Sequence, residues 1–273
     1  MGDKTMTPLA ADVRGIGLLG PGFDSWLAGA PVLAGITPYV PRPPVLPAPD
    51  ALPAAERRRT GAVVRLALAI GFEAASRAAV NPAELPTVFS SSGGDGNNCH
   101  EICETLTTGD RQLSPTRFHN SVHNAASGYW SIAAGATTAS SVLCAFDASF
   151  GAGLLEALTQ VVAEQTTVLL VAYDSGYPEP LRTVRPIPDA FGVAMVLAPT
   201  AASAAPSFPT ISAILTGAPA ESMRDARLEA LRTAIPAARS LPLLSMLARK
   251  ESGRVVLDYL ESQRISIEVS TCG

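Results

Sequence analysis

The chain has 273 residues, of which 47% are hydrophobic and 16% are charged, and its net charge is −4. This length allows one large domain or two small ones, and the apolar fraction suits a tightly packed α/β core with a substantial buried interface. The negative charge argues against a nucleic-acid partner, and the one basic run, Arg57 to Arg59, is better explained as a solvated helix start.

Neither a membrane span nor a targeting signal is visible in the sequence. No window holds the roughly 18 uninterrupted apolar residues that a span needs, and the N-terminus lacks a signal-peptide core. Gly2 is where a myristoylation signal would begin, but Met6 stands where that signal requires serine or threonine. We therefore expect a cytoplasmic protein with no membrane span, in which the four cysteines are reduced.

The first half of the chain shows helix and strand patterns separated by a Pro-rich segment. Residues 31–53 are rich in proline and predict an extended connection on the surface. Residues 54–80 predict one long amphipathic helix. The shorter elements predicted here are strands at 13–19 and 87–89 and helices at 24–28, 99–106, from 114–115 onward, and 127–134.

A strand–turn–helix–strand unit forms the centre of the chain. Residues 140–145 and 167–173 are short apolar runs typical of buried strands, and 148–164 carries one apolar stripe typical of a helix. Such units present a nucleophile on the sharp turn after the first strand. The turn here is Phe146-Asp147-Ala148, and Asp147 has a plain interpretation as the N-cap of the helix.

The last part of the chain continues the α/β pattern. A loop rich in Ala, Ser and Pro is predicted at 200–206, and two strands near the end could close as a hairpin. The elements predicted here are strands at 190–198, 210–216, 253–259 and 264–269 and helices at 222–235 and 241–250.

Cys99, Cys103, His119 and His123 are spaced almost as in a zinc finger. The segment between the two pairs holds a Gly-Asp turn and a Ser-Pro helix start in place of a finger's hydrophobic residues. A domain of this size also has little need of a metal to fold. We expect the four residues to pack or hydrogen-bond, and the metal interpretation stays open.

Three further candidate sites have plain alternatives. The glycine-rich loop at 90–98 lacks the Gly-Lys-Ser/Thr ending of a phosphate loop and is expected to be a tight turn. A triad of Ser149, His119 and Asp174 has no nucleophile-elbow motif to support it. Cys144 is explained as a small buried residue, since a nucleophilic thiol would need a thiolate-stabilising site and a base.

Four segments, in order along the chain, resemble the β-ketoacyl synthase family. GIGLLGPGFDSWLAG is similar to the family's first strand and the segment after it, and LPAAERRRTGAVVRLALAIGFEA to its long helix. HNSVHNAASGYWSIAAG resembles the N-x-A-A-G helix near the dimer contact, and AFGVAMVLAP the G-A-G-V-x-V-L-E strand. The resemblance covers residues 12–199. It implies a thiolase-like layered α/β/α fold, in which 1–273 is a single domain whose part 200–273 is a shortened second half.

The departures from the family pattern concern its catalytic residues. Counted without gaps from Gly128, the position of the family's acyl-accepting cysteine falls on Asp147, and Cys144 lies three residues early. A carboxylate cannot form the thioester that condensation uses. The family's two catalytic histidines lie in the second half, whereas the last histidine here is His123. The resemblance therefore implies a degenerate nucleophile position at Asp147, with no catalytic residue.

This pattern is similar to that of chain-length factors, the non-catalytic synthase-like subunits of type II polyketide and aryl-polyene systems. It implies a heterodimer with an active ketosynthase that elongates polyketide, polyene or fatty acyl chains on an acyl carrier protein, without a cofactor. Phe146, Asp147 and Phe150 are expected at the acyl pocket, although ordinary core packing explains the two phenylalanines equally well. The alternative is an active acyl-thioester enzyme that uses Cys144. His123, Asn124 and Gly128 are expected near the dimer contact.

Overall fold

The computed structural model describes residues 8–200 and 208–271. Its centre is one eight-stranded sheet with the strand order β3-β2-β4-β5-β1-β6-β8-β7. Only the β2–β3 and β2–β4 pairs are parallel, and the other pairs are antiparallel. The strands are β1 (Leu9–Leu19), β2 (Thr87–Ser90), β3 (Ser140–Leu143), β4 (Val168–Asp174), β5 (Phe191–Ala198), β6 (Thr210–Thr216), β7 (Gly253–Asp258) and β8 (Arg264–Ser270).

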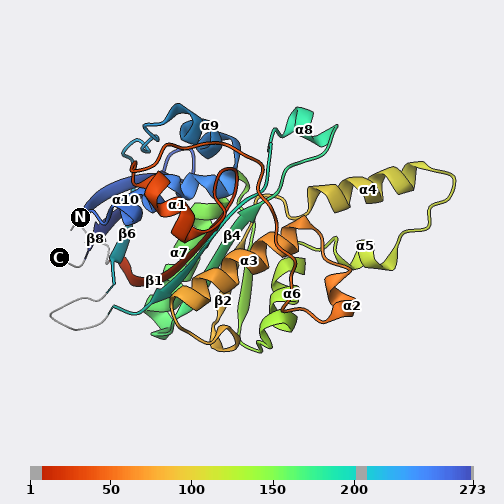
Figure 1. The fold of residues 1–273 in the computed structure, drawn as a ribbon, viewed down its shortest axis with the longest axis horizontal. Coiled ribbons are helices and arrows are strands. Elements are labelled where there is room, and N and C mark those ends of the chain that lie inside the picture. The colour runs from red at the N-terminus through yellow and green to blue at the C-terminus, as the bar shows by residue number, and fades with distance from the viewer. Residues whose placement is uncertain (1–7, 201–207, 272–273) are drawn as a thin grey trace, which may run out of the picture.

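Helices cover both faces of the sheet and form three layers with it (Figure 1). On one face, α3 and α6 enclose a core around Trp130 and Phe89. On the other face, α1, α7, α9 and α10 enclose a second core around Phe150 and Leu154. The longer helices are α1 (Trp26–Leu33), α3 (Ala62–Arg77), α4 (Gly96–Thr107), α6 (Ala125–Ala134), α7 (Ser149–Glu164), α9 (Ala226–Ala234) and α10 (Leu241–Arg249).

The predicted central unit is confirmed, because β3, α7 and β4 follow one another with the expected boundaries to within two residues. All seven residues of β4 are buried, as its continuous apolar run predicts. The predicted hairpin is also confirmed, since β7 and β8 pair in antiparallel register. The loop predicted at 200–206 lies almost wholly outside the described residues.

Two predictions about helices are wrong. The single helix predicted at 54–80 is split into α2 (Ala54–Arg57) and α3, because Gly61 takes extended backbone (φ −81°, ψ −179°) as the N-cap of α3. The segment predicted as extended from Pro31 begins inside a helix, because α1 continues through Pro31 to Leu33. Beyond α1, the segment contains no helix or strand up to α2.

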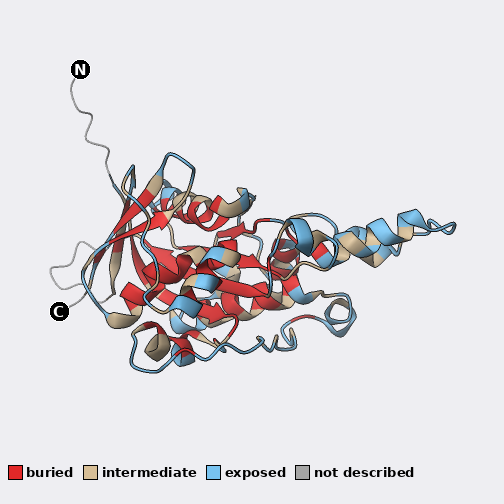
Figure 2. Ribbon diagram, turned by 90° about the horizontal axis from the view of Figure 1, so that it is seen from above, coloured by how far each residue is buried: buried red, intermediate tan, exposed pale blue. Residues whose placement is uncertain are grey.

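An exposed arm extends from the body of the molecule between β2 and α6. It contains α4 and α5 (Pro115–His119), which lie at one end of the molecule in Figure 1 and are mostly exposed in Figure 2. Asn98 Nδ2 donates a hydrogen bond to the Arg117 carbonyl at 2.9 Å, and Arg117 pairs with Glu101. These contacts tie the two helices together, whereas little of the arm is buried against the rest of the chain.

Candidate functional site

The turn between β3 and α7 has a strained backbone at its first residue. The 3-10 helix η2 (Phe146–Ala148) fills this turn, and Phe146 takes a left-handed conformation with φ 51°. This conformation is uncommon for a bulky residue and is concentrated at functional positions. Phe146 is 60% exposed, and the Arg185 guanidinium carbon lies 3.6 Å from the centroid of its ring. The strained position is therefore Phe146, one residue before Asp147.

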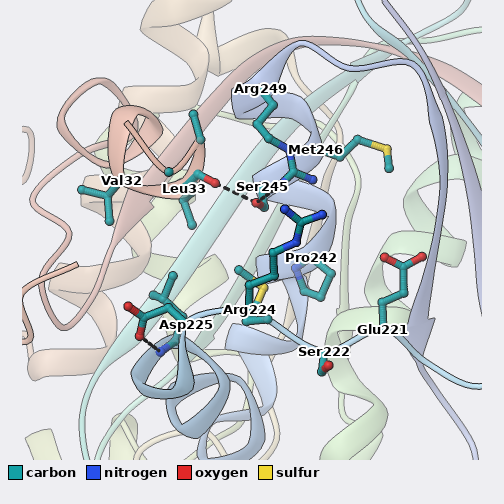
Figure 3. A pocket seen from close by; sticks show the side chains of 14 residues that line it. Val32, Leu33, Glu221, Ser222, Arg224, Asp225, Pro242, Ser245, Met246 and Arg249 are labelled. Carbon is teal, nitrogen blue, oxygen red and sulfur yellow. Dashed lines mark hydrogen bonds between the residues drawn. The ribbon is translucent and has the colours of Figure 1, made fainter. Parts of the chain in front are cut away.

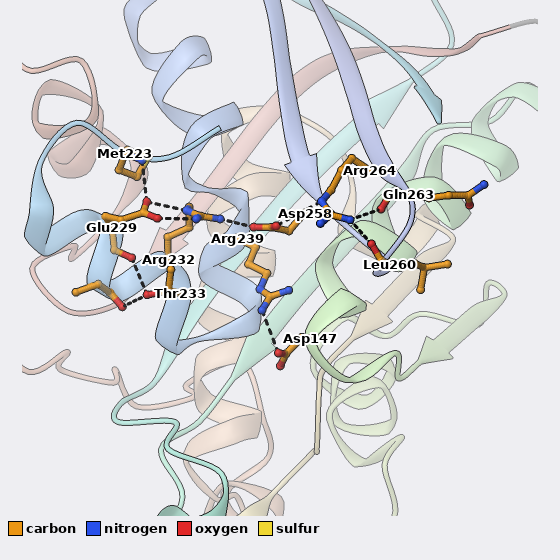
Figure 4. A network of polar contacts seen from close by, with 11 residues as sticks. Asp147, Met223, Glu229, Arg232, Thr233, Arg239, Asp258, Leu260, Gln263 and Arg264 are labelled. Carbon is orange, nitrogen blue, oxygen red and sulfur yellow. Dashed lines mark hydrogen bonds and ion pairs between the residues drawn. The ribbon is translucent and has the colours of Figure 1, made fainter. Parts of the chain in front are cut away.

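Asp147 binds two arginines from distant parts of the chain. Arg185, which follows α8 (Leu181–Val184), lies 2.7 Å from Oδ1. Arg239 in the 3-10 helix η3 (Pro236–Ser240) lies 3.0 Å from Oδ2, as Figure 4 shows. Both arginine side chains are 19% exposed, and that of Asp147 is 39% exposed. We call Asp147, Arg185 and Arg239 the ion triplet.

The N-cap interpretation of Asp147 is wrong. The N-cap position of α7 is Ala148, which makes no side-chain hydrogen bond. The Ser149 hydroxyl instead accepts from the Ala145 backbone amide at 3.1 Å and donates to the Phe146 carbonyl at 2.7 Å. The Asp147 carboxylate is consequently free to face the two arginines, whose charges compensate it better than helix amides would.

A serine loop, residues 90–94, connects the elements around this turn. The Ser90 hydroxyl donates to the Ser149 carbonyl at 2.5 Å. The Ser92 backbone amide and hydroxyl donate to one oxygen of Asp174 at 2.9 and 2.6 Å. The other oxygen of Asp174 accepts from the Ala237 amide in η3 at 2.8 Å. The loop is a tight turn as expected, and Asp174 joins it to the helix that carries Arg239.

Burial raises the pKa of Asp174 to about 6, while hydrogen bonds from Ser92 and Ala237 and the charge of Arg185 act in the opposite direction. The folded chain therefore binds this proton more tightly than the unfolded chain does. The resulting stabilisation is complete below the ordinary pKa of 3.8 and is lost as the pH rises through about 6.

We expect the unfolding free energy of the native chain minus that of Asp174→Asn to fall by about 2 to 3 kcal/mol between pH 4 and pH 7. The reason is that the amide side chain of the variant does not titrate, so the difference isolates the proton that Asp174 holds. Urea unfolding of both proteins across this pH range measures it. A difference that stays constant with pH would show that Asp174 titrates normally.

The other predicted residues of this region are distributed around the serine loop and α6. Cys144 is exposed and lies one residue beyond β3, so the prediction that it is buried in the strand is wrong. Its Sγ–H donates to the Ser92 carbonyl at 3.2 Å. His123 Nε2 lies 3.2 Å from the Ser91 carbonyl. Phe150 is 1% exposed, within the core between α7 and the sheet.

The structure does not assemble the zinc set or the triad. Within residues 8–200 and 208–271, no group of three or more His, Cys, Asp and Glu side chains could hold a metal ion. His119 packs edge-on against Tyr129 at 6.3 Å between ring centroids. The hydrogen bonds of Asp174 come from the serine loop and η3, and those of the Ser149 hydroxyl join it to the turn.

An apolar groove with a volume of about 600 Å³ lies between α5 and α6. Asn124 and Gly128 line it, and a Cβ added to Gly128 would meet no heavy atom within 4 Å. Three large apolar side chains of the groove are exposed. They are Phe118 (68%), Val122 (53%) and Ile132 (48%).

A conserved sequence profile described as the β-ketoacyl synthase N-terminal domain matches residues 35–255. The chain belongs to the β-ketoacyl synthase family. The chain has the mixed α/β, thiolase-like ketosynthase fold of this family, as the resemblance implied. No curated protein shows significant sequence similarity to the chain.

Solved structures of the family cover nearly the whole chain. A ketosynthase (ApeO) in complex with its chain length factor (ApeC) from Xenorhabdus doucetiae matches with a TM-score of 0.71 and 24% identity, over 95% of this chain and 99% of that one. The ishigamide ketosynthase/chain length factor matches with a TM-score of 0.68 and 13% identity, over 98% and 100%. A complex of AntDE with the acyl-carrier protein AntF matches with a TM-score of 0.73 and 10% identity, over 97% and 100%.

The two arginines of the ion triplet were missed by the sequence reasoning. Arg185 and Arg239 lie far from Asp147 in the sequence, in short helical segments with no recognisable motif.

Among the described residues, no helix is both long and apolar enough to cross a membrane.

The ion triplet should contribute measurably to stability. Asp147→Ala leaves two mostly buried arginines without their carboxylate. We expect it to lower the unfolding free energy by about 1–2 kcal/mol after solvent screening is considered. Glu164→Ala, at the exposed end of α7, is the control and should change the unfolding free energy by less than about 0.5 kcal/mol. Denaturant unfolding compares the two, and equal stability of the two variants would contradict a structural role for the ion triplet.

Proposed function

We propose that this chain is a non-catalytic synthase-like subunit of the chain-length-factor type. It pairs with an active ketosynthase that elongates acyl chains of the polyketide or polyene type on an acyl carrier protein, in the cytoplasm. The observation that carries the proposal is the ion triplet at the turn where the family places its nucleophile. The similarity to chains from two ketosynthase/chain-length-factor structures also supports it, because it extends over nearly the full length of both this chain and theirs.

The chemistry of the turn argues against condensation on this chain. Condensation needs an atom that accepts the acyl group as a thioester, and Asp147 offers only carboxylate oxygens. Both oxygens face arginines, at 2.7 and 3.0 Å. An ion pair of this kind stabilises the negative charge and makes the oxygens poorer nucleophiles. The turn therefore keeps the position of a synthase nucleophile without its reactivity.

The partner is proposed to cover the groove between α5 and α6 and the neighbouring edge of the sheet. Exposed apolar surfaces of this kind mark protein interfaces. Among the described strands, the edge strand β3 pairs on one side only, with β2, and unpaired edges are normally covered. Asn124 and Gly128, predicted near the dimer contact, lie in this groove, while His123 is turned toward the serine loop.

The two phenylalanines at the turn have different environments, which separates their proposed roles. Phe146 is exposed beside the ion triplet, where an acyl chain held by the partner could reach it. Phe150 is enclosed in the core and contributes to packing. We therefore assign the wall of the acyl pocket to Phe146 and leave Phe150 as a core residue.

Co-expression with an active ketosynthase of the same system tests the proposal. We expect a stable 1:1 complex by analytical ultracentrifugation, and self-association or poor solubility of this chain by itself, because the groove would be uncovered. The complex should extend acyl-carrier-protein thioesters, whereas this chain without its partner should not. A well-behaved monomer that never binds the ketosynthase would refute the pairing.

A second candidate function is an acyl-thioester enzyme that uses Cys144. The exposed thiol near the turn favours it. The hydrogen bond from Sγ to the Ser92 carbonyl opposes it, because only the protonated thiol makes this contact and the thiolate is the nucleophile.

A further inference from the structure

A cavity of about 350 Å³ beside β1 has a lining of unusual charge. Three of its residues are cationic, namely Arg14, Arg77 and Lys250, and all the lining residues lie in the described ranges without an aspartate or glutamate among them. Its apolar surface includes Trp26, Phe208 and Leu247. We call this space the β1 cavity, and it is separate from the ion triplet and from the groove between α5 and α6.

Arg14 occupies an irregular position in a central strand. The register of β1 against β5 shifts between Val13 and Gly15, so Arg14 is the extra residue of a bulge. Bulges redirect side chains and are frequent beside functional sites. The guanidinium carbon of Arg14 lies 5.2 Å from the centroid of the Phe208 ring. Its Nε is fully buried and has no hydrogen-bond partner within the described structure. A buried charged donor without an acceptor costs free energy that a bound anion would recover.

Two acidic side chains close to Arg14 and Arg77 in the sequence are hydrogen-bonded to other groups, although Glu73 also interacts electrostatically with Arg77. Glu73 accepts from the backbone amides of Leu18 and Trp26 at 2.9 and 2.7 Å. Asp12 accepts from the Thr210 hydroxyl at 2.7 Å. Arg77 and Lys250 stand at the ends of α3 and α10, where cations also complement the helix dipole. Arg14 has no such role, because it lies in a strand.

A second cavity of similar size differs from the β1 cavity in the charge of its lining. It lies between α1, α10 and the segment before α9, and its volume is about 400 Å³ (Figure 3). Arg224 and Arg249 line it together with Glu221 and Asp225, so its charges balance. Asp225 also caps α9 through the Arg227 amide. A cavity with internally balanced charge has no need of an ionic ligand, whereas the described residues that line the β1 cavity include three cations and no carboxylate.

We propose that the β1 cavity binds a small amphipathic anion, with its carboxylate or phosphate head on Arg14 and its apolar part against Trp26 and Leu247. Arg77 and Lys250 add charge at the rim. An apolar wall with a few placed polar groups is the general form of a small-molecule site. This site does not depend on the proposed pairing with a ketosynthase.

Calorimetric titration of the full chain, or of its complex with a ketosynthase, tests the site with three probes of equal chain length. They are octanoate, octyl phosphate and neutral 1-octanol. We expect saturable 1:1 binding of at least one anion, at least tenfold tighter than that of octanol, because a charged hydrogen bond is lost with the neutral head. The tighter of the two anions identifies the head group as a carboxylate or a phosphate.

Three variants locate the binding. Arg14→Met should weaken binding of the preferred anion at least tenfold, and Arg77→Met, at an exposed position that does not threaten folding, should weaken it a few-fold. Arg224→Met in the balanced cavity is the matched control and should bind as the native chain does. Wild-type affinity in both Arg14→Met and Arg77→Met, equal binding of octanol, or no saturable binding of either anion would overturn the proposal.

Discussion

Ile132→Asp is expected to separate this chain from the proposed ketosynthase partner. Ile132 is 48% exposed in the groove of α6, and the proposed partner would bury it. An aspartate there would be buried without a partner for its charge, which is among the costliest changes at an interface. We expect the dissociation constant of the complex to rise about a hundredfold or more. Sedimentation or calorimetry of the two purified subunits measures it.

Val45→Asp is the matched control for this prediction. Val45 is 79% exposed in the Pro-rich segment and is not among the residues that line the groove, so the same substitution should leave the complex intact. Both variants should keep the melting temperature of the isolated chain, because neither position is buried in it. Equal affinity of both variants for the ketosynthase would show that the partner binds elsewhere.

Phe146→Ala and Phe150→Ala are expected to act on different properties, the first mainly on product length and the second on stability. Phe150 is 1% exposed, so its truncation leaves a cavity and should lower the unfolding free energy by about 3–5 kcal/mol. Phe146 is 60% exposed, and its truncation loses mainly the contact with Arg185, worth about 1 kcal/mol. If Phe146 forms the wall of the acyl pocket, its truncation should in addition lengthen the products of the complex.

Denaturant unfolding and mass spectrometry of the products separate these outcomes. Phe146→Leu, which keeps an apolar side chain of intermediate size, should give an intermediate product length. Unchanged product length in Phe146→Ala, measured in a complex of normal composition, would remove Phe146 from the acyl pocket. A small loss of stability in Phe150→Ala would contradict its place in the core.

The central part of the fold could be predicted because its sequence pattern is local. The apolar run of β4 and the stripe of α7 each report burial directly, and the turn between β3 and α7 follows from their order. The break in the helix predicted at 54–80 was missed because Gly61 interrupts a continuous amphipathic pattern by only one residue. Propensity alone does not tell a tolerated glycine from an N-cap.

The candidate site could be predicted only in part. The count from Gly128 predicts a degenerate nucleophile position at Asp147, but Arg185 and Arg239 reach Asp147 only through the tertiary fold. The same holds for Asp174, whose hydrogen bonds from Ser92 and Ala237 join three distant segments. The N-cap interpretation of Asp147 was wrong because a local rule was applied to a side chain whose partners are all distant.

Acylation of the reconstituted complex tests the central claim most directly. The complex is incubated with an acyl-loaded carrier protein, and intact-protein mass spectrometry locates the acyl group on one subunit or the other. We predict acylation of the ketosynthase alone, and unchanged turnover when this chain carries Cys144→Ala. Stoichiometric acylation of this chain at Cys144, with loss of turnover in Cys144→Ala, would contradict a non-catalytic role.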